Sequence, residues 1–207
     1  MKALKNLVVG FLVSFVGSIP LGYLNVIGFE IYQKEKLKAL ILYLTGVIII
    51  EGIIIYSTLL FAKKLAENRK LLRFIDIFSI VFMFVLAGVF FLNHAEPDTG
   101  YKKVIFEHAP ILIGIMFSAL NFIQIPFWLG WNLYLINNRY IVVDSNLKYL
   151  YVFGTVLGTF FGMLSFVLAL DLFSGQNGFL SPKTISLIIP VIFFAMGCFQ
   201  LFKFFRK

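Results

Sequence analysis

The sequence has little charge for its length. Only 14% of its 207 residues are Asp, Glu, Lys or Arg, whereas a soluble domain of ordinary composition has about 25%. Hydrophobic residues make up 60% of the chain, against about 45–50% in such a domain. The shortage of charge excludes a water-soluble globule, and the hydrophobic content excludes a disordered chain. The composition therefore predicts a polytopic membrane protein that has the lipid bilayer as a partner.

Cysteine and catalytic motifs are scarce as well. Cys198 is the single cysteine and lies in an apolar run, which excludes a disulfide framework and a CxxC metal motif. The sequence contains no nucleophile elbow, phosphate-binding loop or HExxH motif. His94 and His108 lie near acidic residues, but their spacing matches no helix-borne metal motif and we interpret this loop as solvated. We therefore expect no enzyme, no cofactor and no metal site.

The basic residues do not form a nucleic-acid-binding surface. The net charge is +8, but Lys and Arg lie at the ends of apolar segments and not along one patch or stripe. This distribution is typical of a protein anchored in a membrane, and nucleic acid is not an expected partner.

Six apolar segments are each long enough to cross a bilayer as a helix, which takes about 17–25 residues. Solid aliphatic runs such as residues 47–50 exclude the alternating pattern of a membrane barrel. We interpret the first segment, preceded by Lys2 and Lys5, as a retained helix and not a signal peptide. The predicted fold is one all-α membrane domain over 1–207, with spans at about 7–29, 39–61, 74–92, 111–136, 149–172 and 185–202.

Loop charges predict the orientation. Of the 18 basic residues, 12 lie in the termini and the second and fourth loops, and 6 in the first, third and fifth loops. Positive residues favour the cytoplasmic side. We therefore expect a multi-pass protein of the inner membrane with both termini in the cytoplasm.

Two similar segments indicate an internal repeat. A polar residue precedes Ile-Pro at Pro20 and at Pro126, 106 residues apart, and Asn25 and Asn132 follow. Each half would hold three helices, so the halves, about 1–93 and 111–207 with a loop at 94–110, would insert in opposite orientations. Inverted repeats with interrupted helices point to a transporter's binding site. The alternative is a chance coincidence in an Ile-rich chain.

The two prolines also mark candidate binding positions. A proline inside a helix frees the carbonyl four residues earlier and presents a half-helix N-terminus that attracts anions. Polar side chains that could satisfy the broken backbone or bind a solute lie near these positions. The predicted substrate-binding residues are Ser18, Pro20, Asn25, Glu51, Asn121, Gln124 and Pro126. A simple proline kink is the alternative.

Glu51 is the acid that lies in the middle of an apolar span. Twelve uncharged residues precede it, back to Ala39, and eleven follow it, up to Ala62. Placing a charge at that depth costs about 2.5–3.5 kcal/mol, so such a residue is a functional candidate. Glu51 could accept a substrate ammonium or a coupling proton. A neutral glutamic acid hydrogen-bonded inside the bundle is the alternative.

Small residues recur at every fourth position in two predicted helices. Such faces let helix backbones approach closely, which favours packing and leaves a homo-oligomer open. The predicted packing residues are Gly10, Ser14 and Gly22 in the first span, with Ser18 on the same face, and Gly154, Gly158 and Gly162 in the fifth.

The chain resembles the LysE-type translocators, which include the homoserine/threonine-resistance exporters. The resemblance runs from Gly10-Phe11 to the basic tail and rests on residues 18–22, the region of Gly46 and Gly52, and residues 121–126. Of the family's Pro-Gly-Pro hallmark, Pro20 matches, with Gly22 two positions on. The resemblance implies amino-acid export, in a superfamily that also includes metal-ion exporters.

Three functions follow as hypotheses. The first is a secondary transporter that exports a small solute, an amino acid above all, and is coupled to a proton or another cation. The second is a divalent metal-ion exporter of the same superfamily. The third is a membrane scaffold without transport activity, in which the small-residue faces matter and Glu51, Pro20 and Pro126 tolerate replacement.

Overall fold

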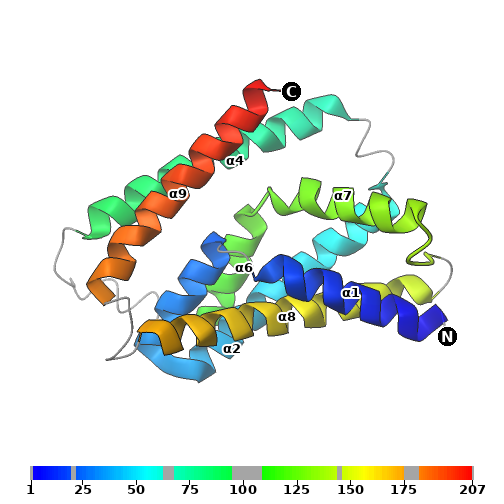
Figure 1. The fold of residues 1–207 in the computed structure, drawn as a ribbon, viewed down its shortest axis with the longest axis horizontal. Helices are drawn as coiled ribbons and strands as arrows, with labels where there is room; N and C mark the ends of the chain where they lie inside the picture. Colours follow the sequence, from blue (N-terminus) through cyan, green and yellow to red (C-terminus); the bar gives the residue numbers. More distant parts are fainter. Residues whose placement is uncertain are drawn as a thin grey trace.

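The computed structural model describes residues 2–19, 22–62, 68–94, 109–143, 146–174 and 182–206, and within these ranges it is helical without any strand. Pro20 and His108, both discussed above, lie outside them. Figure 1 shows the arrangement of the helices. They are α1 (Lys2–Ser18), α2 (Tyr23–Leu60), α4 (Arg69–His94), α6 (Pro110–Leu120), α7 (Gln124–Asn137), α8 (Leu147–Ser174) and α9 (Pro182–Phe205).

Helix α2 is a hairpin of two arms. Lys36, at φ 65° and ψ −166°, interrupts it, a conformation that costs a non-glycine residue about 1–3 kcal/mol. The arms, residues 23–35 and 37–60, fold back on each other (Figure 1). The Tyr43 hydroxyl donates a hydrogen bond to the Leu24 carbonyl across this fold at 2.9 Å. The reversal falls in the polar stretch where the sequence predicts the first loop.

Two helix breaks lie where the sequence predicts interrupted helices. Helix α1 ends at Ser18 before α2 begins at Tyr23, and α6 meets α7 at a bend of 71°. Pro126 lies in the first turn of α7, where its missing N–H removes no intrahelical hydrogen bond. The second break therefore precedes the proline and is not centred on it.

Glycines let two pairs of helices approach to backbone contact. Helix α8 packs on α1 through Gly154, Gly158 and Gly162, where an added Cβ would meet the carbonyls of the facing helix. Helix α2 packs on α6 in the same way. Gly10 faces the Tyr151 carbonyl of α8. Gly22, expected in the same ladder as Gly10, lies beyond the end of α1, at the N-cap of α2.

Helices α4 and α9 pack on each other along one side of the molecule (Figure 1). Aromatic contacts join this pair to the remaining helices. The ring centroids of Phe78 and Phe122 are 4.6 Å apart, and those of Tyr23 and Phe82 are 5.4 Å apart. Tyr23, the first residue of α2, therefore lies between the α1–α2–α6–α8 core and the α4–α9 pair.

The described helices are apolar enough for membrane insertion. By length and composition, α2, α4 and α8 can each cross a membrane, and α6 with α7 makes a fourth candidate if the bent pair is one span. Large hydrophobic side chains such as Ile53, Leu112 and Phe153 are exposed on the outer surface. The predictions of an all-helical fold and of apolar helices long enough to span a membrane are confirmed. Six spans in two repeats stay a prediction.

Asn6 joins the start of α1 to the segment between α7 and α8. Its buried amide donates to the carbonyls of Val142 and Leu147 at 2.8 and 2.9 Å, and its Oδ1 accepts from the Val142 N–H at 3.1 Å. We expect Asn6→Ala to destabilise the fold by roughly 2–3 kcal/mol, because three backbone groups lose their partner. The measurement is thermal unfolding of the purified protein in detergent.

The matched control is Asn138→Ala. Asn138 also donates its side-chain amide to a carbonyl, that of Tyr134 at 2.8 Å, but it does so at the exposed end of its own helix. Water can replace that bond, so we expect little change in melting temperature. Equal losses in the two variants would contradict the structural role assigned to Asn6.

Candidate functional site

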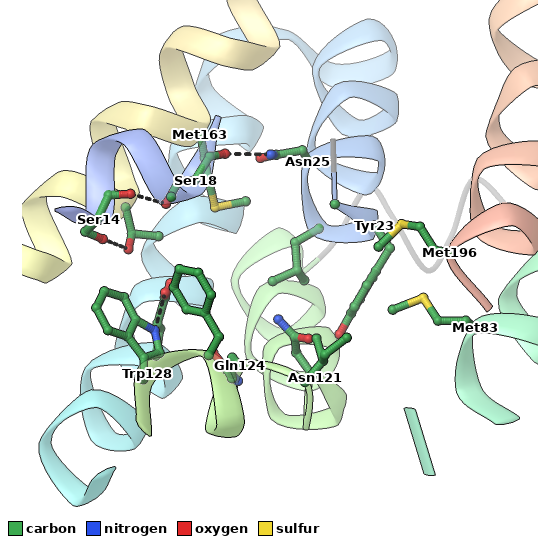
Figure 2. A pocket seen from close by; sticks show the side chains of 17 residues that line it. Ser14, Ser18, Tyr23, Asn25, Met83, Asn121, Gln124, Trp128, Met163 and Met196 are labelled. Atoms are coloured by element: carbon green, nitrogen blue, oxygen red, sulfur yellow. Dashed lines mark hydrogen bonds between the residues drawn. The ribbon is translucent and has the colours of Figure 1, made fainter. Parts of the chain in front are cut away.

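A cavity of about 340 Å³ lies where the two helix breaks meet (Figure 2). Its walls come from both sides of each break, from α2 and α8, and from the facing surfaces of α4 and α9. The volume falls at the lower end of the roughly 300–1,000 Å³ of small-molecule sites. The arrangement suits a small solute.

Five of the seven predicted binding residues line this cavity. Ser18 and Asn25 come from the first break, Asn121 and Gln124 from the second, and Glu51 from the second arm of α2. Pro126 does not line it, although Phe127 and Trp128, the next two residues of α7, do. Pro20 lies outside the described residues.

Glu51 belongs to a group of polar side chains from four helices. The Trp128 indole Nε1 of α7 donates to Glu51 Oε1 at 3.1 Å, and Thr159 of α8 lines the same cavity near the carboxyl group. Thr159 in turn shares a hydrogen bond of 2.6 Å with Ser14 of α1. Among the described residues that line the cavity, none is Lys, Arg or His. The carboxyl group therefore faces neutral donors and the cavity.

At both breaks, side-chain amides donate hydrogen bonds to backbone carbonyls near the helix end. Asn25 donates to the Ser18 carbonyl at the end of α1, and Gln124 donates to the Ser118 carbonyl near the end of α6, each at 2.8 Å. The Ser18 hydroxyl donates back to the Ser14 carbonyl at 2.8 Å. These bonds supply the partners that broken helices need inside a membrane.

The side chain of Asn121 has an unsatisfied hydrogen-bond acceptor. Its Oδ1 is buried and has no hydrogen-bond partner among the described residues, and the side chain lines the cavity. Leaving a buried acceptor unsatisfied costs about 1–3 kcal/mol. A donor group in the cavity, such as an ammonium, would relieve this cost.

Two helix N-termini border the same cavity. Gly22, Tyr23 and Leu24 line it at the start of α2, and Ile123 and Gln124 line it at the start of α7. First-turn N–H groups carry partial positive charge. At α7, however, the Gln124 and Ile125 N–H groups already donate to the Asn121 and Phe122 carbonyls, and Pro126 has no N–H, so the start of α2 is the N-terminus that suits an anion. The cavity thus combines an acidic side chain with backbone groups that favour an anion.

Sequence reasoning missed several residues of this site. Trp128, Thr159 and three methionines line the cavity, yet none belongs to a motif. The available signals were weak: Trp128 follows Pro126 closely, and Thr159 is adjacent to Gly158 in a small-residue face. Only the packing of α7 and α8 against α2 shows that both side chains reach Glu51.

No metal site stands out in the part of the chain that the structure describes. There, no three side chains of His, Cys, Asp or Glu gather in a way that could hold a metal ion.

No protein-family model, curated protein or solved structure matches this chain. The resemblance to LysE-type exporters therefore stays a prediction, and the function is argued from the cavity.

Proposed function

We propose that the protein is a secondary transporter that exports a small solute across the inner membrane by ion-coupled alternating access. The proposed solute is an amino acid. The observation that carries the proposal is the shared cavity at the two helix breaks, with the Glu51 carboxyl group in its wall. Membership in the LysE-type family is part of this proposal. Broken helices at the membrane midplane are where secondary transporters bind their substrates.

The polar groups suit the two charges of an amino acid. The helix N-terminus at Tyr23 favours a carboxylate, while Glu51 and the unsatisfied Asn121 Oδ1 favour an ammonium. In an apolar bundle each solute charge needs such a partner, since burying an unpaired charge is costly. Glu51 is the group in this wall able to exchange a coupling proton for the ammonium.

We further propose six spans in two inverted repeats. In this arrangement α1 with residues 23–35 forms a broken first span, residues 37–60 the second and α4 the third. Helices α6 and α7 form the broken fourth span, α8 the fifth and α9 the sixth. Both termini face the cytoplasm, as the loop charges favour.

Matching contacts in the two halves support the repeat. Tyr43 and Gly46 in α2 have the same spacing as Tyr151 and Gly154 in α8. Each tyrosine hydroxyl donates to the second part of its own half's broken span, Tyr43 to the Leu24 carbonyl and Tyr151 to Asn132 Oδ1. Each glycine lies against a backbone carbonyl of the opposite half's first helix. Chance similarity of two Ile-Pro pairs would not produce these paired contacts.

The test is transport by the purified full chain in proteoliposomes. Vesicles are loaded with one labelled L-amino acid, and its exchange and its efflux under an imposed proton gradient are measured against protein-free vesicles. We expect saturable, gradient-dependent movement of at least one amino acid. If the vesicles transport Mn²⁺ or Zn²⁺ but none of the amino acids, the result would contradict amino-acid export and favour metal-ion export. Movement of neither class would favour a scaffold.

A further inference from the structure

Three methionines from three helices line the cavity: Met83 of α4, Met163 of α8 and Met196 of α9. They are three of the five methionines in the chain. Met83 and Met163 are almost fully buried. Methionine is flexible and polarisable, so a wall of methionines adapts to apolar groups of different shapes.

Met83 and Met196 occupy a different part of the cavity from the carboxyl group, whereas Met163 lies near Ser18 (Figure 2). Figure 2 shows Met83 and Met196 beside Tyr23, on the side of the cavity opposite Trp128. Trp128 holds the Glu51 carboxyl group. The cavity therefore has a polar end at Glu51 and an end lined by thioethers between α4 and α9.

A charged substrate side chain would have no partner at the thioether end. Glu51 is the one Asp, Glu, Lys, Arg or His among the described residues that line the cavity. A second charge, as in lysine or glutamate, would lose its hydration without gaining a counterion, which is costly. An apolar side chain gains free energy from the same transfer.

We infer that the site takes amino acids with apolar side chains, such as leucine or methionine, and that Met83, Met163 and Met196 determine this specificity. The inference rests on the proposed function, since it names the substrate class of the same cavity. The amino and carboxylate groups bind at the polar end near the helix breaks, and the side chain lies against the thioethers.

The test compares polar and apolar replacements of the methionines in the proteoliposome assay. The wild type is expected to exchange L-leucine faster than L-serine or L-lysine. The double variant Met83→Gln/Met196→Gln keeps the side-chain length but adds two amides. It is expected to lower the ratio of the leucine exchange rate to the serine exchange rate about tenfold or more, which is the size of effect that one methylene has in an apolar pocket. Met83→Leu with Met196→Leu is expected to preserve the ratio.

Two further variants guard against misfolding. Met116→Gln places the same substitution on the exposed surface of α6 and is expected to leave the ratio unchanged.

Met163→Ala adds space to the apolar wall without adding polarity. It is expected to raise the exchange of L-phenylalanine relative to L-leucine about threefold, and an unchanged ratio counts against the inference.

The outcomes separate this inference from the proposed function. Equal exchange of leucine, serine and lysine by the wild type overturns the inference and leaves the transporter proposal standing. If the wild type exchanges no amino acid at all, the proposed transport function itself is contradicted. Thioethers are also ligands for Cu(I), so Cu(I) binding that the Leu variants abolish, without leucine exchange, would overturn the inference in favour of a soft-metal site.

Discussion

Glu51→Gln is expected to reduce ion-coupled efflux of the transported amino acid about 100-fold, because losing one partner of a buried charge pair costs about 2–5 kcal/mol. The substitution changes the shape of the side chain very little. The glutamine oxygen can still accept the hydrogen bond that Trp128 Nε1 donates to Glu51 at 3.1 Å. What is lost is the negative charge and the exchangeable proton. The measurement is the initial efflux rate from loaded proteoliposomes, with and without a proton gradient.

Two variants separate charge from packing at this position. Trp128→Phe removes the indole donor but keeps the carboxyl group, and we expect a smaller loss of about tenfold, in line with one hydrogen bond to a charged group. Glu30→Gln makes the same chemical change in the same helix at a residue that does not line the cavity, and should leave efflux unchanged. If Glu51→Gln retains both the rate and its dependence on the gradient, Glu51 is a packing residue.

The helical fold was predictable because the bilayer imposes it. In hydrocarbon, backbone groups must be satisfied within each segment, so long apolar runs must become helices. The break positions were predictable from the Ile-Pro pairs at Pro20 and Pro126, each preceded by a polar residue in an apolar span. Their distance from the prolines was less predictable, because Pro126 fits in the first turn of α7 and the bend falls before it.

The thioether end of the cavity was not predictable from sequence. Met83 and Met196 are ordinary residues in apolar helices, and their role depends on how the α4–α9 pair faces the other helices across the cavity. The position of Gly22 was also misassigned, because a spacing of four residues assumes that α1 continues past Ser18. Periodicity predicts the faces of a continuous helix, and it fails where the helix is interrupted.

Gly154→Leu is expected to destabilise the protein by roughly 3 kcal/mol or more, the upper part of the range for overpacked interiors. A Cβ at Gly154 would meet the backbone of Leu7, and backbone cannot move aside as a flexible side chain can. The same substitution at Gly46, which faces the Ile111 carbonyl of α6, is expected to have a similar effect. The measurement is the apparent melting temperature in detergent.

Gly88→Leu and Gly130→Leu are the matched controls, because a Cβ at either helical position has nothing within 4 Å. Leucine favours the helix over glycine by up to about 1 kcal/mol, so these variants are expected to be neutral or slightly stabilised. The sign of the effect therefore differs between contact and open positions although the chemical change is the same. Equal changes at all four glycines would mean that α1 does not approach α8, nor α6 approach α2, at backbone distance. Similar losses at Gly46 and Gly154 would in turn support equivalent roles for the two helix pairs, as an inverted repeat requires.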